Sequence, residues 1–178
     1  HVAITELLLP AMVEVGRRGE ADAAAIWEEH LATETVLGLL AGLAASARPG
    51  GANRLLGLVG CVPNDEHQLA PAALSAYLEL RGWNAPSLGR TLPAGQVVLA
   101  AEALEPDAVF LSMNLLSRLH DAVAVVDALR RSRPGCPVFV GGRRAATART
   151  PLEAAGARVA GSFDEAHLLA TGELPDRA

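Results

Sequence analysis

Short apolar runs and helical stretches alternate from residue 54 to the end of the chain, and this alternation constrains the fold more than any other feature. The apolar runs predict strands at 55–62, 83–88, 108–112, 137–140 and 157–160. Periodic apolar positions predict helices at 68–81, 93–104, 117–131, 144–155 and 163–171. Short apolar strands separated by helices pair in parallel, with helices on both faces of the sheet. The sequence therefore predicts an α/β fold with a five-stranded, doubly wound parallel sheet.

The first 47 residues are typical of helices instead. One amphipathic segment precedes 16–19 (Gly-Arg-Arg-Gly), where we expect an interruption, and a second runs over about 21–47. We therefore expect a helical cap (a partial bundle) over 1–47, a linker over 48–53 and a flavodoxin-like or Rossmann-like domain over 54–178. Two helices cannot bury their apolar faces alone, so they must pack on the rest of the chain, on further helices upstream or on a partner.

Composition excludes several classes of protein. The net charge is -5, all 15 basic residues are arginine, and no basic run is present, so we expect no nucleic acid to be bound by this segment. No apolar stretch reaches the roughly 20 residues of a membrane span, and 51% hydrophobic residues exclude disorder. Two cysteines and no signal peptide predict a cytoplasmic protein without a disulfide framework. Because His1 takes the place of an initiator methionine, we expect the segment to be cut from a longer chain or to follow a tag.

Ligands of such sheets bind beyond the carboxyl ends of the strands, and three of the loops there carry unusual residues. The first has Asp65-Glu66-His67, the second has Ser112-Met113-Asn114, and the third has Gly141-Gly142. Taken alone, the histidine is a surface residue and the glycines permit a tight turn. Taken together at one sheet edge, they indicate a metal-ligating imidazole held by a carboxylate, beside backbone that a flat ligand can approach closely.

These loops resemble the signature of cobalamin (vitamin B12)-binding domains, which is Asp-x-His-x-x-Gly, Ser-x-Leu and Gly-Gly. This sequence has Asp65-x-His67-x-x-Ala70, Ser112-x-Asn114 and Gly141-Gly142, so alanine replaces the usual glycine and asparagine the usual leucine. The resemblance extends over about residues 2–171.

The resemblance implies that cobalamin binds base-off and His-on. His67 would be the lower axial ligand of cobalt, with Asp65 or Glu66 as the outer partner of its imidazole. The nucleotide tail would thread into the sheet beside Ser112, Gly141 and Gly142, with Gly161 near its end. Ser112 would donate a hydrogen bond to that tail, whereas the alternative for its hydroxyl is to cap the helix that follows.

In the light-sensing members of this family, a helical bundle over the upper face of the corrin carries Trp-x9-Glu-His, which covers a 5'-deoxyadenosyl group. This chain has Glu29-His30, but Gly19 stands where the tryptophan is expected. A void of that size is not left empty. Either Trp27 fills it, or the upper ligand of cobalt is small, or a second flat molecule lies there.

The cofactor that we expect is cobalamin in the form of adenosylcobalamin. A related group of cobalamin photoreceptors pairs cobalamin with a bilin such as biliverdin and resembles the third case. Arg17, Arg18, Arg143 and Arg144 would then pair with bilin propionates, although surface arginines are the simpler interpretation. Cys61 could anchor a bilin covalently, but its position at a strand end favours a core cysteine.

Glu29-His30 favours a light sensor over the alternatives. Light would remove the upper ligand, His30 would approach cobalt as a new ligand, and the chain would change its association as a homo-oligomer (dimer) or with a downstream partner. The alternative is a corrinoid protein that carries methyl groups for a methyltransferase system, and a third interpretation is an α/β response domain without a cofactor. No acid–base pair or nucleophile motif predicts a stand-alone enzyme.

Overall fold

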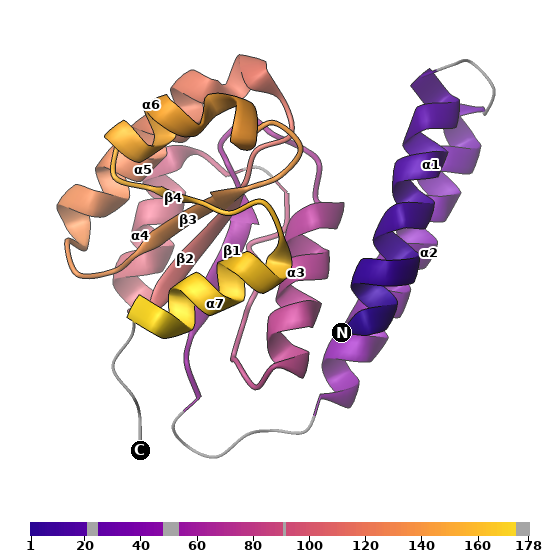
Figure 1. The fold of residues 1–178 in the computed structure, drawn as a ribbon, viewed down its shortest axis with the longest axis horizontal. Helices are drawn as coiled ribbons and strands as arrows, with labels where there is room; N and C mark the ends of the chain where they lie inside the picture. The colour runs from indigo at the N-terminus through magenta and orange to yellow at the C-terminus, as the bar shows by residue number, and fades with distance from the viewer. Residues whose placement is uncertain (21–24, 48–53, 91, 174–178) are drawn as a thin grey trace.

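The computed structural model describes residues 1–20, 25–47, 54–90 and 92–173 (Figure 1). Its centre is a parallel sheet in the order β1-β2-β3-β4, which confirms the predicted fold class. The strands are β1 (Gly57–Cys61), β2 (Ala108–Ser112), β3 (Val138–Gly141) and β4 (Arg158–Val159). Gly57 pairs with Ala108 and Ser112 pairs with Gly141, so the carboxyl ends of β1, β2 and β3 lie in line.

Helices cover both faces of the sheet (Figure 1). One face carries α4, α5 and α6, and the other carries α3 and α7. Their bounds are α3 Leu69–Leu80, α4 Ala94–Leu104, α5 Leu119–Ser132, α6 Arg149–Ala154 and α7 Phe163–Glu173, with short 3-10 turns at Leu116–Arg118 and Ala146–Ala148. Each lies close to its predicted range.

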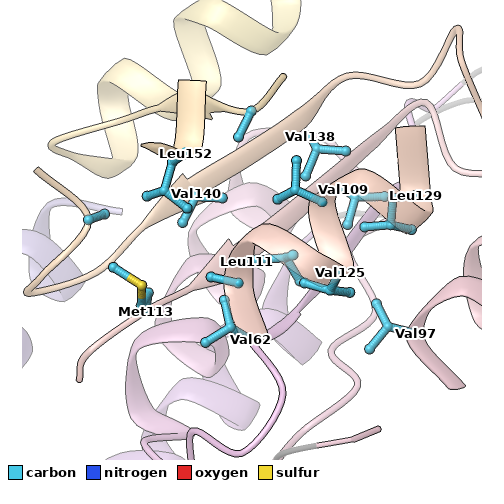
Figure 2. Packing of buried hydrophobic residues seen from close by; sticks show 14 of the residues in the cluster. Val62, Val97, Val109, Leu111, Met113, Val125, Leu129, Val138, Val140 and Leu152 are labelled. Carbon is cyan, nitrogen blue, oxygen red and sulfur yellow. The ribbon is translucent and has the colours of Figure 1, made fainter. Parts of the chain in front are cut away.

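Alternate residues of each strand supply the two cores. Val109 and Leu111 of β2 belong to the cluster under α4, α5 and α6, whereas Phe110 between them belongs to the cluster under α3 and α7. Figure 2 shows the first cluster, in which valine and leucine side chains from the strands meet Val125 and Leu129 of α5. Because both faces of the strands are buried, the strands appear in the sequence as continuous apolar runs.

The expected fifth strand, 83–88, is not part of the sheet in the described residues. This segment makes only two isolated parallel bridges to the β1 side, Leu56 with Asn84 and Val59 with Ser87. Pro86 lies between the two bridges and has no N–H to donate, which accounts for the incomplete pairing. The segment still follows one edge of β1 while β2 follows the other, so the chain reverses its direction of winding between β1 and β2. Ligands of open α/β sheets bind at such a switch point.

The helical cap is an antiparallel pair beside α3 (Figure 1). It consists of a π-helical turn (Ile4–Leu8), α1 (Leu9–Glu20) and α2 (Ile26–Ser46). Ile4, Val36 and Leu40 are buried in the same cluster as the core residues of α3, so the cap shares the core of the sheet. No described helix has the length and apolar character of a membrane span. The predicted linker (48–53) and the ends of two other predicted segments (21–24 and 174–178) lie outside the described residues.

The interruption predicted at 16–19 is wrong, because α1 continues through it to Glu20. Two glycines inside a helix cost about 2 kcal/mol relative to alanine, but packing of the hairpin and of α1 on the core offsets this cost. Gly19 serves a close approach between the helices, since a Cβ there would lie 3.0 Å from Oε2 of Glu29 in α2. On the exposed side, Arg17 donates to both carboxylate oxygens of Glu14 at 2.7 and 2.8 Å.

Candidate cobalamin site

Asp65, in the loop after β1, is fully buried and organises the strand-end loops. Its Oδ1 accepts the backbone N–H of His67 at 3.1 Å and lies 2.6 Å from Nδ1 of the same residue. Its Oδ2 accepts the backbone N–H of Asn114, after β2, at 2.6 Å. A buried carboxylate requires such donors. Asp65 therefore joins the loops of β1 and β2 and fixes the ring of His67.

The imidazole of His67 is prepared to bind a metal through its outer nitrogen. A carboxylate accepts only, so Nδ1 carries the proton in the bond to Asp65 and Nε2 keeps a free lone pair. The side chain of His67 is 56% exposed. In the part of the chain that the structure describes, no group of three or more His, Cys, Asp or Glu side chains could hold a metal ion.

A cavity of about 1030 Å³ lies between the cap and the strand ends. This volume is at the upper end of the range for small-molecule sites. The predicted site residues that line it are Glu29, His30, Glu66, His67, Ala70, Ser112, Asn114, Gly141, Gly142 and Gly161. Asp65 lies behind His67, and Trp27 does not line the cavity. The structure therefore brings the two sequence motifs, from the cap and from the strand ends, to one cavity.

The position where the cap departs from the expected pattern also lies near this cavity. Glu29 and His30 line it from α2, and Glu29 fills the space in front of Gly19. Trp27, which could have replaced the missing indole, is 65% exposed on α2. The upper part of the cavity is walled instead by Leu9, Met12 and Val13 of α1.

Comparison with known proteins decides the family. The sequence profile of the B12 binding domain matches residues 55–169, and a second profile of the same description matches residues 2–43. The chain belongs to the B12-binding domain family. The HTH-type transcriptional repressor CarH of Myxococcus xanthus is 36% identical over 146 residues, which are 80% of this chain and 48% of the repressor. The chain thus spans about half the length of this curated relative.

Solved structures share the fold of this B12-binding domain at lower identity. A cobalamin-binding protein from Desulfitobacterium hafniense DCB-2 is 21% identical, with a TM-score of 0.62 over 97% of this chain and 84% of its own. The monomethylamine corrinoid protein of Methanosarcina barkeri is 18% identical, with a TM-score of 0.69 over 97% of this chain and 83% of its own. The named relatives are thus a repressor and corrinoid proteins.

Gly142 is explained by the fold of the B12-binding domain itself. Its φ is +100°, and a Cβ there would lie 2.6 Å from the carbonyl oxygen of Met113. Gly141 has an ordinary φ, and its nearest neighbour would be the carbonyl oxygen of Ala160 at 3.4 Å. The tight turn therefore accounts for Gly142, whereas neither φ nor a close contact requires glycine at position 141.

The arginines that were predicted near the cofactor differ in position. Arg143 lines the cavity, and one of its Nη atoms lies 3.9 Å from the site of a Cβ on Gly16 of α1. Arg18 and Arg144 do not line it, and Arg17 is paired with Glu14. Arg90 also lines the cavity, and its Nε donates to Oε1 of Gln68 at 3.3 Å.

Sequence reasoning did not single out Arg90, Thr33 or Glu34, which all line the cavity. Thr33 and Glu34 lie four residues after Glu29 and His30, so helical spacing already places them on the same face. Arg90 comes just after the segment 83–88, which runs beside β1, and so lies among the loops where ligands of such sheets bind. Helical spacing and sheet topology could therefore have identified all three residues from the sequence.

Cys61, at the end of β1, is a core residue of the B12-binding domain. Its side chain is buried, and burial together with the charge of Asp65 raises the pKa of the thiol to about 12. A thiol in this state is a poor nucleophile at neutral pH. The geometry agrees with a structural cysteine.

Proposed function

We propose that this chain is a light-responsive regulatory B12 protein that binds cobalamin base-off and His-on beneath the helical cap. The observation that carries the proposal is the buried Asp65, which holds Nδ1 of His67 at a cavity that His67 lines together with Glu29 and His30. A ligating histidine held in this way by a carboxylate is oriented and more basic. When bound, an alkylcobalamin such as adenosylcobalamin supplies a cobalt–carbon bond that visible light cleaves.

The residues of this chain divide between the two sides of the corrin. His67 would provide the lower ligand, and Ser112, Gly141 and Gly161 would border the path of the nucleotide tail. Glu29 and His30 on α2 would lie on the side of the upper ligand, together with the apolar wall of α1. His30 would be the imidazole on this side that could replace an upper ligand lost in light.

The change in association proposed for the illuminated state is supported by the surface of the cap. Several large apolar side chains outside the cavity are exposed there, namely Leu7, Ile26, Trp27, Leu31 and Leu39. Movement of α2 upon ligand loss would alter this surface and thereby change its binding to a second copy of the chain or to a downstream partner. Size-exclusion chromatography of the cobalamin-loaded chain, dark and illuminated, tests this part.

The lower-ligand assignment is tested by the absorption spectrum of the chain reconstituted with adenosylcobalamin. We expect His67→Ala to abolish the His-on spectrum, whereas His120→Ala, an exposed histidine of α5 outside the cavity, leaves it unchanged. Illumination should convert the spectrum irreversibly, and His30→Ala should alter only the illuminated product. A His-on spectrum that survives His67→Ala contradicts the assignment.

Biliverdin as a second chromophore is a finer part of the proposal. Its support is that Trp27 is exposed and does not enter the cavity, and that two arginines, Arg90 and Arg143, line it. Added biliverdin should produce a long-wavelength absorption band that Arg143→Ala weakens. If no band appears, a cobalamin-only sensor is left.

A corrinoid methyl carrier is the second candidate function, favoured by the fold that this chain shares with methyl-transfer corrinoid proteins. The upper face of a methyl carrier must be reachable by its partner enzymes. Loading with methylcobalamin distinguishes the two functions. A carrier gives up its methyl group to a methyltransferase in the dark, whereas a sensor loses it only in light.

A further inference from the structure

Asn114, directly after β2, is hydrogen-bonded to the loops after β1 and β3 and to the last residue of β2. Its backbone N–H donates to Asp65, its Nδ2 lies 3.0 Å from Oγ of Ser112, and its Oδ1 accepts the backbone N–H of Arg143 at 3.3 Å. The Ser-x-Leu signature that this sequence resembles has leucine at this position, and leucine can make neither of the two side-chain bonds. The departure from the family pattern therefore adds polar contacts at the wall of the cavity.

The bond to Arg143 determines which way the amide of Asn114 points. A backbone N–H can only donate, so the amide oxygen must face Arg143 and the NH2 group must face Ser112. Nδ2 then donates a hydrogen bond to Oγ of Ser112, which acts as the acceptor. The hydroxyl proton is turned away from Asn114 and is left to donate elsewhere.

Ser112 is buried, with 7% of its surface exposed, and lines the cavity. Among the described residues its hydroxyl donates to no acceptor. A buried hydroxyl with an unused proton is costly unless a ligand or water accepts it. The hydroxyl proton of Ser112 is therefore turned away from Asn114 and has no acceptor among the described residues. It can be donated to a ligand in the cavity.

We propose that Asn114 is a positioning residue that sets the Ser112 hydroxyl as a donor to an acceptor atom on the nucleotide tail of the bound corrinoid. This inference rests on the proposed binding of cobalamin and adds to it a residue that acts through Ser112. The same amide ties the loop at Gly142 and Arg143 to β2, so the two walls of the tail path are held together.

Two substitutions at this position separate positioning from simple packing. Asn114→Asp keeps the shape and the acceptor for Arg143, but its second oxygen faces Ser112 and captures the hydroxyl proton. Asn114→Leu restores the family residue and leaves the hydroxyl free to rotate. We expect the affinity for hydroxocobalamin to fall about tenfold in Asn114→Asp and by a smaller factor in Asn114→Leu.

The decisive readout is hydroxocobinamide, a corrinoid without the nucleotide tail. Its affinity should change less than about twofold in both variants, because the tail contact is absent. In a Ser112→Ala background, Asn114→Asp should add almost nothing to the loss for hydroxocobalamin, since the two residues act as one unit. A structural role alone would weaken both ligands alike.

The outcomes distinguish this inference from the function on which it rests. If the unaltered chain binds neither corrinoid, both are overturned. If it binds both and the variants weaken them equally, or if the effect of Asn114→Asp persists in the Ser112→Ala background, only the role of Asn114 is overturned.

Discussion

The most informative perturbation of this B12-binding domain is Asp65→Asn, because one buried carboxylate serves both the fold and the site. An asparagine keeps the shape of the side chain but replaces one acceptor oxygen by an NH2 donor. Oδ1 receives two donors from His67, at 3.1 and 2.6 Å, and Oδ2 receives the N–H of Asn114 at 2.6 Å. Whichever way the amide turns, at least one buried N–H group faces another donor.

The magnitude follows from these contacts. Loss of a hydrogen bond to a charged acceptor costs about 1.5–3 kcal/mol, and the donor left unpaired is buried. We therefore expect the free energy of unfolding to fall by about 2–4 kcal/mol. This leaves a domain of ordinary stability folded, because such domains have about 5–15 kcal/mol.

The same substitution acts on cobalamin through the tautomer of His67. An NH2 group toward Nδ1 favours the tautomer with the proton on Nε2, which cannot ligate cobalt. Loss of the carboxylate partner of a metal-ligating histidine weakens binding about 10–100-fold. Both effects of Asp65→Asn therefore arise from one atom exchange.

Urea denaturation followed by circular dichroism measures the first effect, and titration with hydroxocobalamin followed by absorbance measures the second. The matched control is Asp121→Asn in α5, whose carboxylate lies 3.2 Å from Nδ2 of Asn64 and 3.9 Å from Arg118. Its side chain is partly exposed, so we expect a loss below about 1 kcal/mol. If Asp65→Asn lies within about 0.5 kcal/mol of the unaltered chain and binds cobalamin equally well, the reasoning is refuted.

Two further predictions concern the fold around the site. Gly142→Ala should lower the free energy of unfolding by about 2–4 kcal/mol, because the residue has a positive φ and a Cβ would collide with the backbone of Met113. Gly38→Ala, in open space on α2, should instead raise it by up to about 1 kcal/mol. Urea denaturation measures both changes, and equal effects would contradict the argument. For His167 of α7, burial and the charge of Arg81 lower the pKa below its ordinary 6.5, despite the opposing charge of Asp164. Its contribution to stability is therefore complete above pH 6.5 and is lost as the pH falls through the lowered pKa, when Nδ1 can no longer accept the indole N–H of Trp83. Between about pH 7 and pH 5, His167→Asn should lose less stability than the unaltered chain, and parallel pH profiles would count against this role.

The sequence predicts most of the sheet because burial on both faces leaves a direct record in apolar runs. It fails at 83–88 for a local reason, since Pro86 removes a ladder hydrogen bond in a run that is otherwise typical of a strand. It fails at 16–19 for a tertiary reason, since packing of the helical hairpin and of α1 on the core offsets the cost of two glycines. A local pattern cannot report that packing.

The candidate site was predictable where it follows from topology. Carboxyl ends of parallel strands share one edge, so Asp65, Ser112 and Gly141 had to lie near each other. The bond from the backbone of Asn114 to Asp65 was not predictable, because a backbone donor carries no sequence signal. The Gly-Gly motif indicated a tight turn, but it could not show that the backbone of Met113 is what requires glycine at position 142, because this contact also leaves no sequence signal.

The arrangement of α3 explains why the cap and the strand-end loops belong to one site. This helix begins at Leu69, two residues after His67, and its buried face packs on the sheet through Tyr77 and its neighbours. Its other side carries α2, whose Val36 and Leu40 lie in the same hydrophobic cluster. Because packed interiors transmit displacement rather than absorb it, the loop of His67 and the helix of His30 are held at a distance set by α3. The cavity between them is therefore a property of the shared core, and a substitution in that core, such as Leu40→Ala, acts on both walls of the site together.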